Sequence, residues 1–116
     1  AARLRTELHR LLMALARKDW EAAAAALRGG EGAWTPARLE AELAPYYAAH
    51  PRIDVTPAAR RPHQTFVKEV APRRWEAVQR LVDEAGEVDW MLQCEVDLSG
   101  DFDPDAPVIS LLRVGT

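Results

Sequence analysis

The sequence predicts an α+β fold in which N-terminal helices pack on a curved antiparallel sheet of four to five strands. From Leu4 to Tyr47, apolar side chains recur every three to four positions, which is the period of amphipathic helices. In the second half the period changes to two, as in strands with one buried face. A length of 116 residues, with 48% hydrophobic residues, suffices for one core. We therefore expect a single domain over residues 1–116.

Two helices are expected first. Residues 2–17 form the first helix, because five leucines share one helical face: Leu4, Leu8, Leu11, Leu12 and Leu15. Asp19 is suited to cap a second helix, whose apolar stripe is Trp20, Ala24 and Leu27. Gly29–Gly30 then provide a C-terminal stop.

A third helix is expected from the Thr35–Pro36 pair to about Ala49. The Thr35 hydroxyl is a good cap, and Pro36 suits the first helical position, where no N–H donor is needed. Pro51 prevents continuation. The stripe of this helix is suited to pack on a sheet: Leu39, Leu43, Tyr46 and Tyr47.

Strands are expected over residues 64–70, 74–83, 88–98 and 107–114, after a weak period-two start at 53–55. The alternation is clearest in 88–98, so Trp90 and Leu92 should lie on an apolar face that the helices cover. The segment Glu84–Glu87 predicts a tight hairpin connection, and residues 99–105 predict a turn-rich loop.

Composition excludes several classes of function. The formal net charge is -3 and the pI is about 5.6, so the chain as a whole lacks the basic field of a general nucleic-acid-binding protein. No apolar run is long enough to cross a membrane. A single cysteine, Cys94, and no signal peptide favour the cytoplasm, with Cys94 in the core. The chain starts inside a helical pattern, as expected for a domain excised from a longer protein.

The sequence contains no motif that predicts catalysis or cofactor binding. No phosphate-binding glycine loop ends in lysine, and neither Ser99 nor Ser110 lies in a nucleophile motif. His9, His50, His63 and Cys94 lack the spacing of a zinc site. The carboxylates of 101–105 lack the glycine and the glutamate of a calcium loop. We expect no catalytic, cofactor or metal residues.

Two arginine pairs bracket the first long strand and are candidates for phosphate contact. They are Arg60, Arg61, Arg73 and Arg74. Arginine pairs at strand ends can contact a nucleic-acid backbone, although such residues more often only improve solubility. Any contact with RNA or DNA would therefore be local.

The order of helices and sheet, with the helix junction Leu15–Ala22, resembles the cone-shaped fold of nuclear transport factor 2-like proteins. A second resemblance lies in the pattern Trp75-x3-Gln79-x-Leu81-x-Asp83, Gly86-x2-Asp89-Trp90 and Glu95–Leu98. This pattern is similar to an uncharacterised domain at the C-terminal end of bacterial DEAD/DEAH-box helicases. Its residues describe a hairpin with tryptophan anchors.

The second resemblance implies a noncatalytic accessory domain of an ATP-dependent helicase. ATP and Mg²⁺ would then be bound only by the helicase lobes of the parent protein. The expected partners are those lobes and an RNA or a protein, with no membrane contact. We expect a monomer or a weak homodimer, because polar residues occupy the outer face of 88–98.

The alternative is a freestanding cone-fold protein that binds or acts on a small apolar ligand. Cone folds hold such ligands in a cavity between sheet and helices, where a carboxylate or histidine moves protons. The side chains expected to reach such a cavity are Tyr46, Tyr47, Asp54, His63, Trp75, Gln79 and Trp90. Satisfied structural roles for these residues are the competing interpretation.

Overall fold

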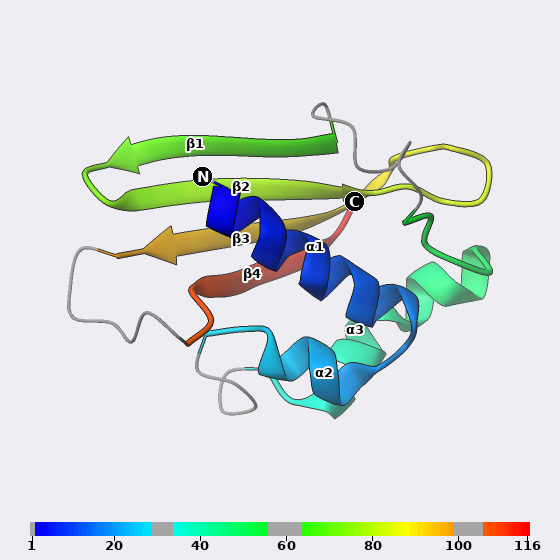
Figure 1. Ribbon diagram of the computed structural model, residues 1–116. Coiled ribbons are helices and arrows are strands. Elements are labelled where there is room, and N and C mark those ends of the chain that lie inside the picture. Colours follow the sequence, from blue (N-terminus) through cyan, green and yellow to red (C-terminus); the bar gives the residue numbers. More distant parts are fainter. Residues whose placement is uncertain (1, 29–33, 56–63, 99–105) are drawn as a thin grey trace.

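The computed structural model describes residues 2–28, 34–55, 64–98 and 106–116, and it confirms the predicted α+β class. The helices are α1 (Ala2–Ala16), α2 (Trp20–Ala25) and α3 (Pro36–Ala49), and the strands are β1 (Thr65–Ala71), β2 (Arg74–Leu81), β3 (Trp90–Asp97) and β4 (Ile109–Gly115). All helices precede all strands, and α1 lies across one face of the sheet (Figure 1).

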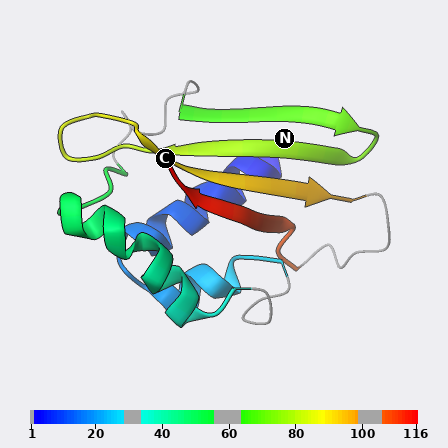
Figure 2. The ribbon, with the colours of Figure 1, turned by 180° about the vertical axis from the view of Figure 1, so that it is seen from behind.

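The sheet is an open antiparallel meander in the order β1-β2-β3-β4. Ala77 in the middle of β2 pairs with Val67 on one side and with Cys94 on the other. The pairing of β1 with β2 is interrupted between Glu69 and Ala71, and the pairing of β3 with β4 is interrupted between Gln93 and Cys94. Seen from behind, none of the described helices covers the second face of the strands (Figure 2).

The core lies between the helices and the first face of the sheet, as the alternation predicted. Leu8, Leu11 and Leu15 of α1 are fully buried, as are Leu92 and Ile109 of the sheet. Trp90 is half-buried and packs against this core, whereas Leu92 has no exposed surface. The helices α2 and α3 extend the core beyond the β4 edge, where Trp34 donates a hydrogen bond to the Leu111 carbonyl at 2.9 Å.

Both predicted helix caps are present. The Asp19 carboxylate accepts the Ala22 N–H, and the Thr35 hydroxyl oxygen accepts the Arg38 N–H at 3.0 Å. These bonds satisfy backbone donors that have no partner within the first turn. Lys18, at φ 56°, turns the chain between α1 and α2.

Several predicted boundaries differ from the observed ones. The helix α2 ends at Ala25, before Leu27, and residues 53–55 form only an isolated bridge between Asp54 and Val82 rather than a strand. The tight turn predicted at Glu84–Glu87 is present, closed by the Gly86 N–H, which donates to the Asp83 carbonyl at 3.0 Å, but the pairing of β2 with β3 ends farther out, at Leu81 and Trp90. The predicted stop at Gly29–Gly30 and the loop 99–105 lie outside the described residues.

Candidate functional site

An aromatic cluster joins the end of α3 to the start of β3. The Tyr46 ring is fully buried, and its centroid lies 5.2 Å from Tyr47, 4.9 Å from His50 and 5.6 Å from Trp90. The contacts with Tyr47 and Trp90 are edge-to-face, an arrangement that aromatic quadrupoles favour. Three of the predicted pocket residues therefore meet, and they pack against one another.

The two tyrosine hydroxyls of this cluster are bound to backbone carbonyls. Tyr46 donates to the Arg52 carbonyl at 2.7 Å, and Tyr47 donates to the Leu15 carbonyl at 2.6 Å. Burial, and secondly the charge of Asp83, raise the pKa of Tyr46 far above its ordinary value. Burial raises the pKa of Tyr47 to about 12. Both hydroxyls stay protonated at neutral pH and serve as structural donors.

Two other predicted pocket residues, Trp75 and Gln79, lie outside this cluster. Trp75 is six residues before Leu81, the partner of Trp90, which is about 20 Å along a strand. It borders a hollow of about 70 Å³ with Leu4, Val96, Leu98 and Val108. Gln79 is buried beside β1, where its side-chain oxygen accepts the Thr65 hydroxyl at 2.6 Å and its amide donates to two carbonyls. His63 lies outside the described residues.

The described members of the arginine pairs have partners within the chain. Arg73, at φ 62° in the turn between β1 and β2, donates to the Leu98 carbonyl at 2.7 Å. Arg74 lies 3.4 Å from the Glu95 carboxylate and 3.5 Å from that of Asp97. These contacts brace one end of the β2–β3 ladder. Arg60 and Arg61 fall in a segment that the structure does not describe.

A polar cluster of His50, Asp83 and Glu84 adjoins the aromatic cluster. The His50 Nδ1 atom is 3.1 Å from Glu84 Oε2 and 3.5 Å from Asp83 Oδ2. His50 is the C-cap of α3, and both carboxylates belong to the connection that follows β2. One nitrogen and two carboxylate oxygens are donors that divalent metal ions accept.

The Asp83 carboxylate is fixed by the backbone around it. Its side chain is 4% exposed, and its Oδ1 atom accepts the N–H groups of Ala85 at 2.9 Å and Glu87 at 3.0 Å. Gly86, at φ 82°, completes this turn and donates to the Asp83 carbonyl. With Oδ1 occupied in this way, Oδ2 is directed to His50.

The chain between α3 and β1 is tied to the same corner. The Asp54 N–H donates to the Val82 carbonyl at 2.7 Å, next to Asp83. Together with the bond from Tyr46 to the Arg52 carbonyl, this bridge holds the chain that follows His50 against the end of β2. Asp54 thus contributes through its backbone to the position of the cluster.

A basic surface runs along α1, on the side away from its leucines. The α1 arginine stripe consists of Arg3, Arg10 and Arg17, the last of which directly follows α1 and still donates its backbone N–H to the Met13 carbonyl. Their spacing of seven places them on one face about 10 Å apart. All are exposed, and Arg3 pairs with Glu7 at 2.7 Å. The side chains of Arg10 and Arg17 have no hydrogen-bond or ion-pair partner among the residues that the structure describes.

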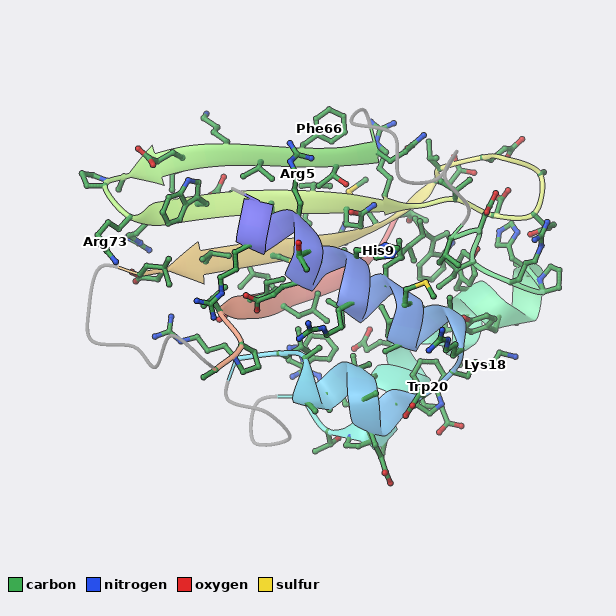
Figure 3. The ribbon with its side chains drawn as sticks, viewed as in Figure 1. Arg5, His9, Lys18, Trp20, Phe66 and Arg73 are labelled. Atoms are coloured by element: carbon green, nitrogen blue, oxygen red, sulfur yellow. The ribbon has the colours of Figure 1, made fainter. Side chains whose placement is uncertain are left out.

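A hollow of about 650 Å³ lies beside the α1 arginine stripe. Its walls come from α1, from α2 and from the chain before β4: Arg3, Thr6, Glu7, Arg10, Ala22, Ala25, Ala26, Ala106 and Pro107. Figure 3 shows that α1 also carries Arg5 and His9, and that Lys18 and Trp20 lie at the far end of the helix from Arg5. The α1 wall of the hollow carries two arginines, one of them paired with Glu7, and the α2 wall consists of small alanines.

Both the His50 cluster and the α1 arginine stripe were missed by the sequence predictions. The stripe had a signal, because arginine recurs at every seventh position from Arg3. The cluster had none, since His50 is far in sequence from Asp83. Cys94 is buried as predicted, and burial raises the pKa of its thiol to about 12, so it is no nucleophile at neutral pH.

Comparison with known proteins identifies the family of the chain. Residues 1–114 match a family described as "Domain of unknown function (DUF3516)". The chain belongs to this family. No curated protein and no solved structure matches the chain. Among the described parts of the chain, no helix is long and apolar enough to cross a membrane.

Proposed function

We propose that the chain is a noncatalytic accessory domain of an ATP-dependent helicase, which contacts nucleic acid or protein in the cytoplasm. The hairpin pattern from Trp75 to Leu98 supports this role through its resemblance to the terminal domain of DEAD/DEAH-box helicases. ATP and Mg²⁺ would be bound by the parent lobes. Kinship with nuclear transport factor 2-like proteins is part of the same proposal.

A role in contact rather than chemistry fits the polar groups of the domain. The two tyrosines, Gln79 and Asp83 are engaged with backbone groups, and the Cys94 thiol is buried. Nucleophilic or acid–base catalysis needs such groups free to reach a substrate. Within the described ranges, these residues instead hold the fold together.

The α1 arginine stripe is the observation that carries the proposal. Residues 2–18 contain five basic residues and one acidic residue, a formal charge of +4, whereas the whole chain is at -3. Positive charge is therefore concentrated on α1 and the turn that follows it. Arg10 and Arg17 are exposed and face away from the leucine stripe, so a polyanion can reach them without unfolding the domain.

The chemistry of the hollow favours contact with a backbone over recognition of bases. Among the described residues, no aromatic side chain lines the hollow beside Arg10, so these residues offer no surface on which bases could stack. Arginine contacts with phosphates are independent of sequence and weaken as salt rises. Two or three such contacts guide a strand that the helicase lobes already hold.

The outer face of the sheet fits a monomer or a weak homodimer. Phe66 is 49% exposed there, but its neighbours include the charged side chain of Arg80, whose guanidinium lies 5.1 Å from the ring. Figure 3 places Phe66 at β1, on the opposite margin of the molecule from Trp20. A stable dimer needs a broader apolar surface.

The small-ligand alternative receives less support from the cavities. Pockets for small molecules usually measure about 300–1,000 Å³. The hollow beside Trp75, between α1 and the sheet, measures about 70 Å³. The hollow of about 650 Å³ lies between α1, α2 and residues 106–107, away from the predicted pocket residues.

The complete protein that contains this chain provides the test. We compare ATP turnover and duplex unwinding for the intact protein, for a form lacking residues 1–116 and for Arg10→Glu/Arg17→Glu. We expect basal ATP turnover within about twofold of the intact protein, and unwinding lowered by at least about fivefold at low salt.

The control is Arg80→Glu/Arg113→Glu, which makes the same charge change on the sheet and should unwind normally. Absence of helicase lobes from the complete protein would overturn the proposal. Equal unwinding by all four forms would remove the role assigned to α1. Loss of ATP turnover in the deleted form would make the domain part of the motor.

A further inference from the structure

We infer that His50, Asp83 and Glu84 form a binding site for a divalent first-row transition-metal ion, with Zn²⁺ as its natural probe. The site lies between the end of α3 and the connection that follows β2. The three residues each offer one donor atom, and these atoms lie within 4.8 Å of one another. This inference does not depend on the helicase role.

The spacing of the donor atoms fits a metal ion at their centre. The His50 Nδ1 atom is 3.1 Å from Glu84 Oε2 and 3.5 Å from Asp83 Oδ2. In a tetrahedral zinc site with bonds of about 2.0–2.1 Å, neighbouring ligand atoms lie about 3.4 Å apart. Glu84 is partly exposed, so a small rotation of its side chain adjusts the distance between its carboxylate oxygen and that of Asp83.

The ligands are held in place by their own contacts. The N–H groups of Ala85 and Glu87 occupy Oδ1 of Asp83 and leave Oδ2 for the site. The backbone N–H of His50 donates to the Tyr46 carbonyl at 2.8 Å, and the His50 ring lies against the Tyr46 ring. Such outer contacts orient ligands and raise metal affinity.

Charge and exposure also suit a metal ion. With neutral imidazole, the two carboxylates give the cluster a formal charge of about −2, which a divalent ion neutralises. The side-chain exposure rises from 4% at Asp83 to 22% at His50 and 35% at Glu84. One side of the site is therefore open, and water can supply a fourth ligand.

The donor set selects the class of metal. Mg²⁺ and Ca²⁺ prefer sites made only of oxygen donors, and Ca²⁺ takes six or more ligands. An imidazole nitrogen with two carboxylates suits Zn²⁺ and its first-row neighbours. Bound metal would join α3 to the β2–β3 connection, two elements that are distant in sequence.

The test is titration of the tag-free chain with Zn²⁺ by calorimetry, in parallel with Mg²⁺ and Ca²⁺. We expect one Zn²⁺ per chain, an increase in Tm with Zn²⁺, and no heat with the other two ions at the same concentrations. Co²⁺ should give the visible absorption of a four-coordinate site. His50→Gln and Glu84→Gln should each weaken Zn²⁺ binding by at least about 100-fold, since each removes a ligand.

Glu87→Gln is the matched control, because its side chain is exposed on the same connection and is no ligand. It should bind Zn²⁺ as the unchanged chain does. Asp83→Asn retains the oxygen that accepts the two N–H groups, so it tests the buried ligand with the turn preserved. Circular dichroism without metal checks the fold of every variant.

Two results would overturn the site. The first is the absence of one-to-one Zn²⁺ binding at millimolar metal, which would leave the cluster as a histidine–carboxylate ion pair. The second is equal Zn²⁺ affinity in the double variant His50→Gln/Glu84→Gln, which would place bound metal on other residues. Neither result bears on the helicase proposal, whose assay uses the α1 variants.

Discussion

The two ends of the helix-facing side of the sheet each carry a tryptophan, and they are packed differently. Trp90 meets the buried Tyr46 ring edge-on at 5.6 Å. Trp75 borders a hollow of about 70 Å³ under the start of α1. The same residue type on the same face thus completes an aromatic cluster at one end and leaves space at the other.

The polar residues near the two ends also differ, because those near Trp90 are more deeply buried than those near Trp75. Beside Trp90, Asp83 is buried and holds two backbone N–H groups. Beside Trp75, Arg74 faces the carboxylates of Glu95 and Asp97 on the exposed surface. Buried hydrogen bonds contribute more than solvent-screened ion pairs. The Trp90 end should therefore contribute more to stability.

Truncation of Trp90 should have the largest effect. Trp90→Ala removes the ring that packs on Tyr46, and it should lower the free energy of unfolding by about 3 kcal/mol. Trp90→Phe keeps an aromatic ring and should cost about half as much. Urea unfolding followed by circular dichroism measures both. A smaller loss of unfolding free energy for Trp90→Ala than for Trp75→Ala would reverse the comparison.

Removal of the Asp83 carboxylate should come next. Asp83→Ala leaves the N–H groups of Ala85 and Glu87 without their acceptor, at a cost of about 2 kcal/mol. Asp89→Ala, an exposed change in the same connection, should cost less than about 0.5 kcal/mol. Equal unfolding midpoints for the two variants would contradict the structural role of Asp83.

Truncation of Trp75 should have a smaller effect than truncation of Trp90. Trp75 is half-buried and already borders empty space, so Trp75→Ala should cost about 1–2 kcal/mol. Leu4→Ala, on the opposite wall, tests whether the hollow collapses when one wall is shortened. Comparison of the double variant with the two single variants by urea unfolding gives their coupling.

The tyrosines at the Trp90 end should make stability fall in alkaline solution. Burial raises the folded-state pKa of Tyr47 from 10.0 to about 12, so the unfolded chain loses its proton first. The contribution of Tyr47 to the free energy of unfolding is fully present below pH 10 and is lost as pH rises toward 12. Absorbance titration of tyrosinate and unfolding of Tyr47→Phe measure the effect. Ionisation near pH 10 in the folded chain would contradict it.

Loss of the Arg74 ion pairs should have the smallest effect. Arg74 and its carboxylate partners are substantially exposed, so Arg74→Ala should change the free energy of unfolding by less than about 0.5 kcal/mol. Added salt should reduce the difference further. A cost similar to that of Asp83→Ala, measured under the same conditions, would remove the contrast between the two ends.

Local patterns predicted most of the fold. The cap of Asp19, the cap of Thr35 and the alternation from Trp90 depend on neighbouring residues only, and all are observed. The tight turn predicted at Glu84–Glu87 is present, but the strand pairing ends at Leu81 and Trp90, so the β2–β3 connection is longer than predicted. Where the sequence showed a weak alternation at 53–55, the structure has an isolated bridge between Asp54 and Val82.

Much less of the candidate site could be predicted. Residue type alone could suggest Tyr46, Tyr47 and Trp90 as members of one pocket, but their mutual packing depends on how α3 meets β3. Trp75 and Gln79 share a face with Trp90, but most of β2 separates Trp75 from it, and the Gln79 side chain bonds to Thr65 and Gln64 instead. Membership of one face therefore does not bring residues to one site.

The sequence by itself determined the elements of this protein, their order and the apolar face of each, because periodicity and capping are set within a few residues. It also determined the α1 arginine stripe, since a spacing of seven needs only a helix. The meeting of His50 with Asp83 and Glu84 was decided by tertiary structure alone. Its physical reason is the packing of α3 beside the sheet, aided by the bridge from Asp54 to Val82, which brings distant donors within 4.8 Å.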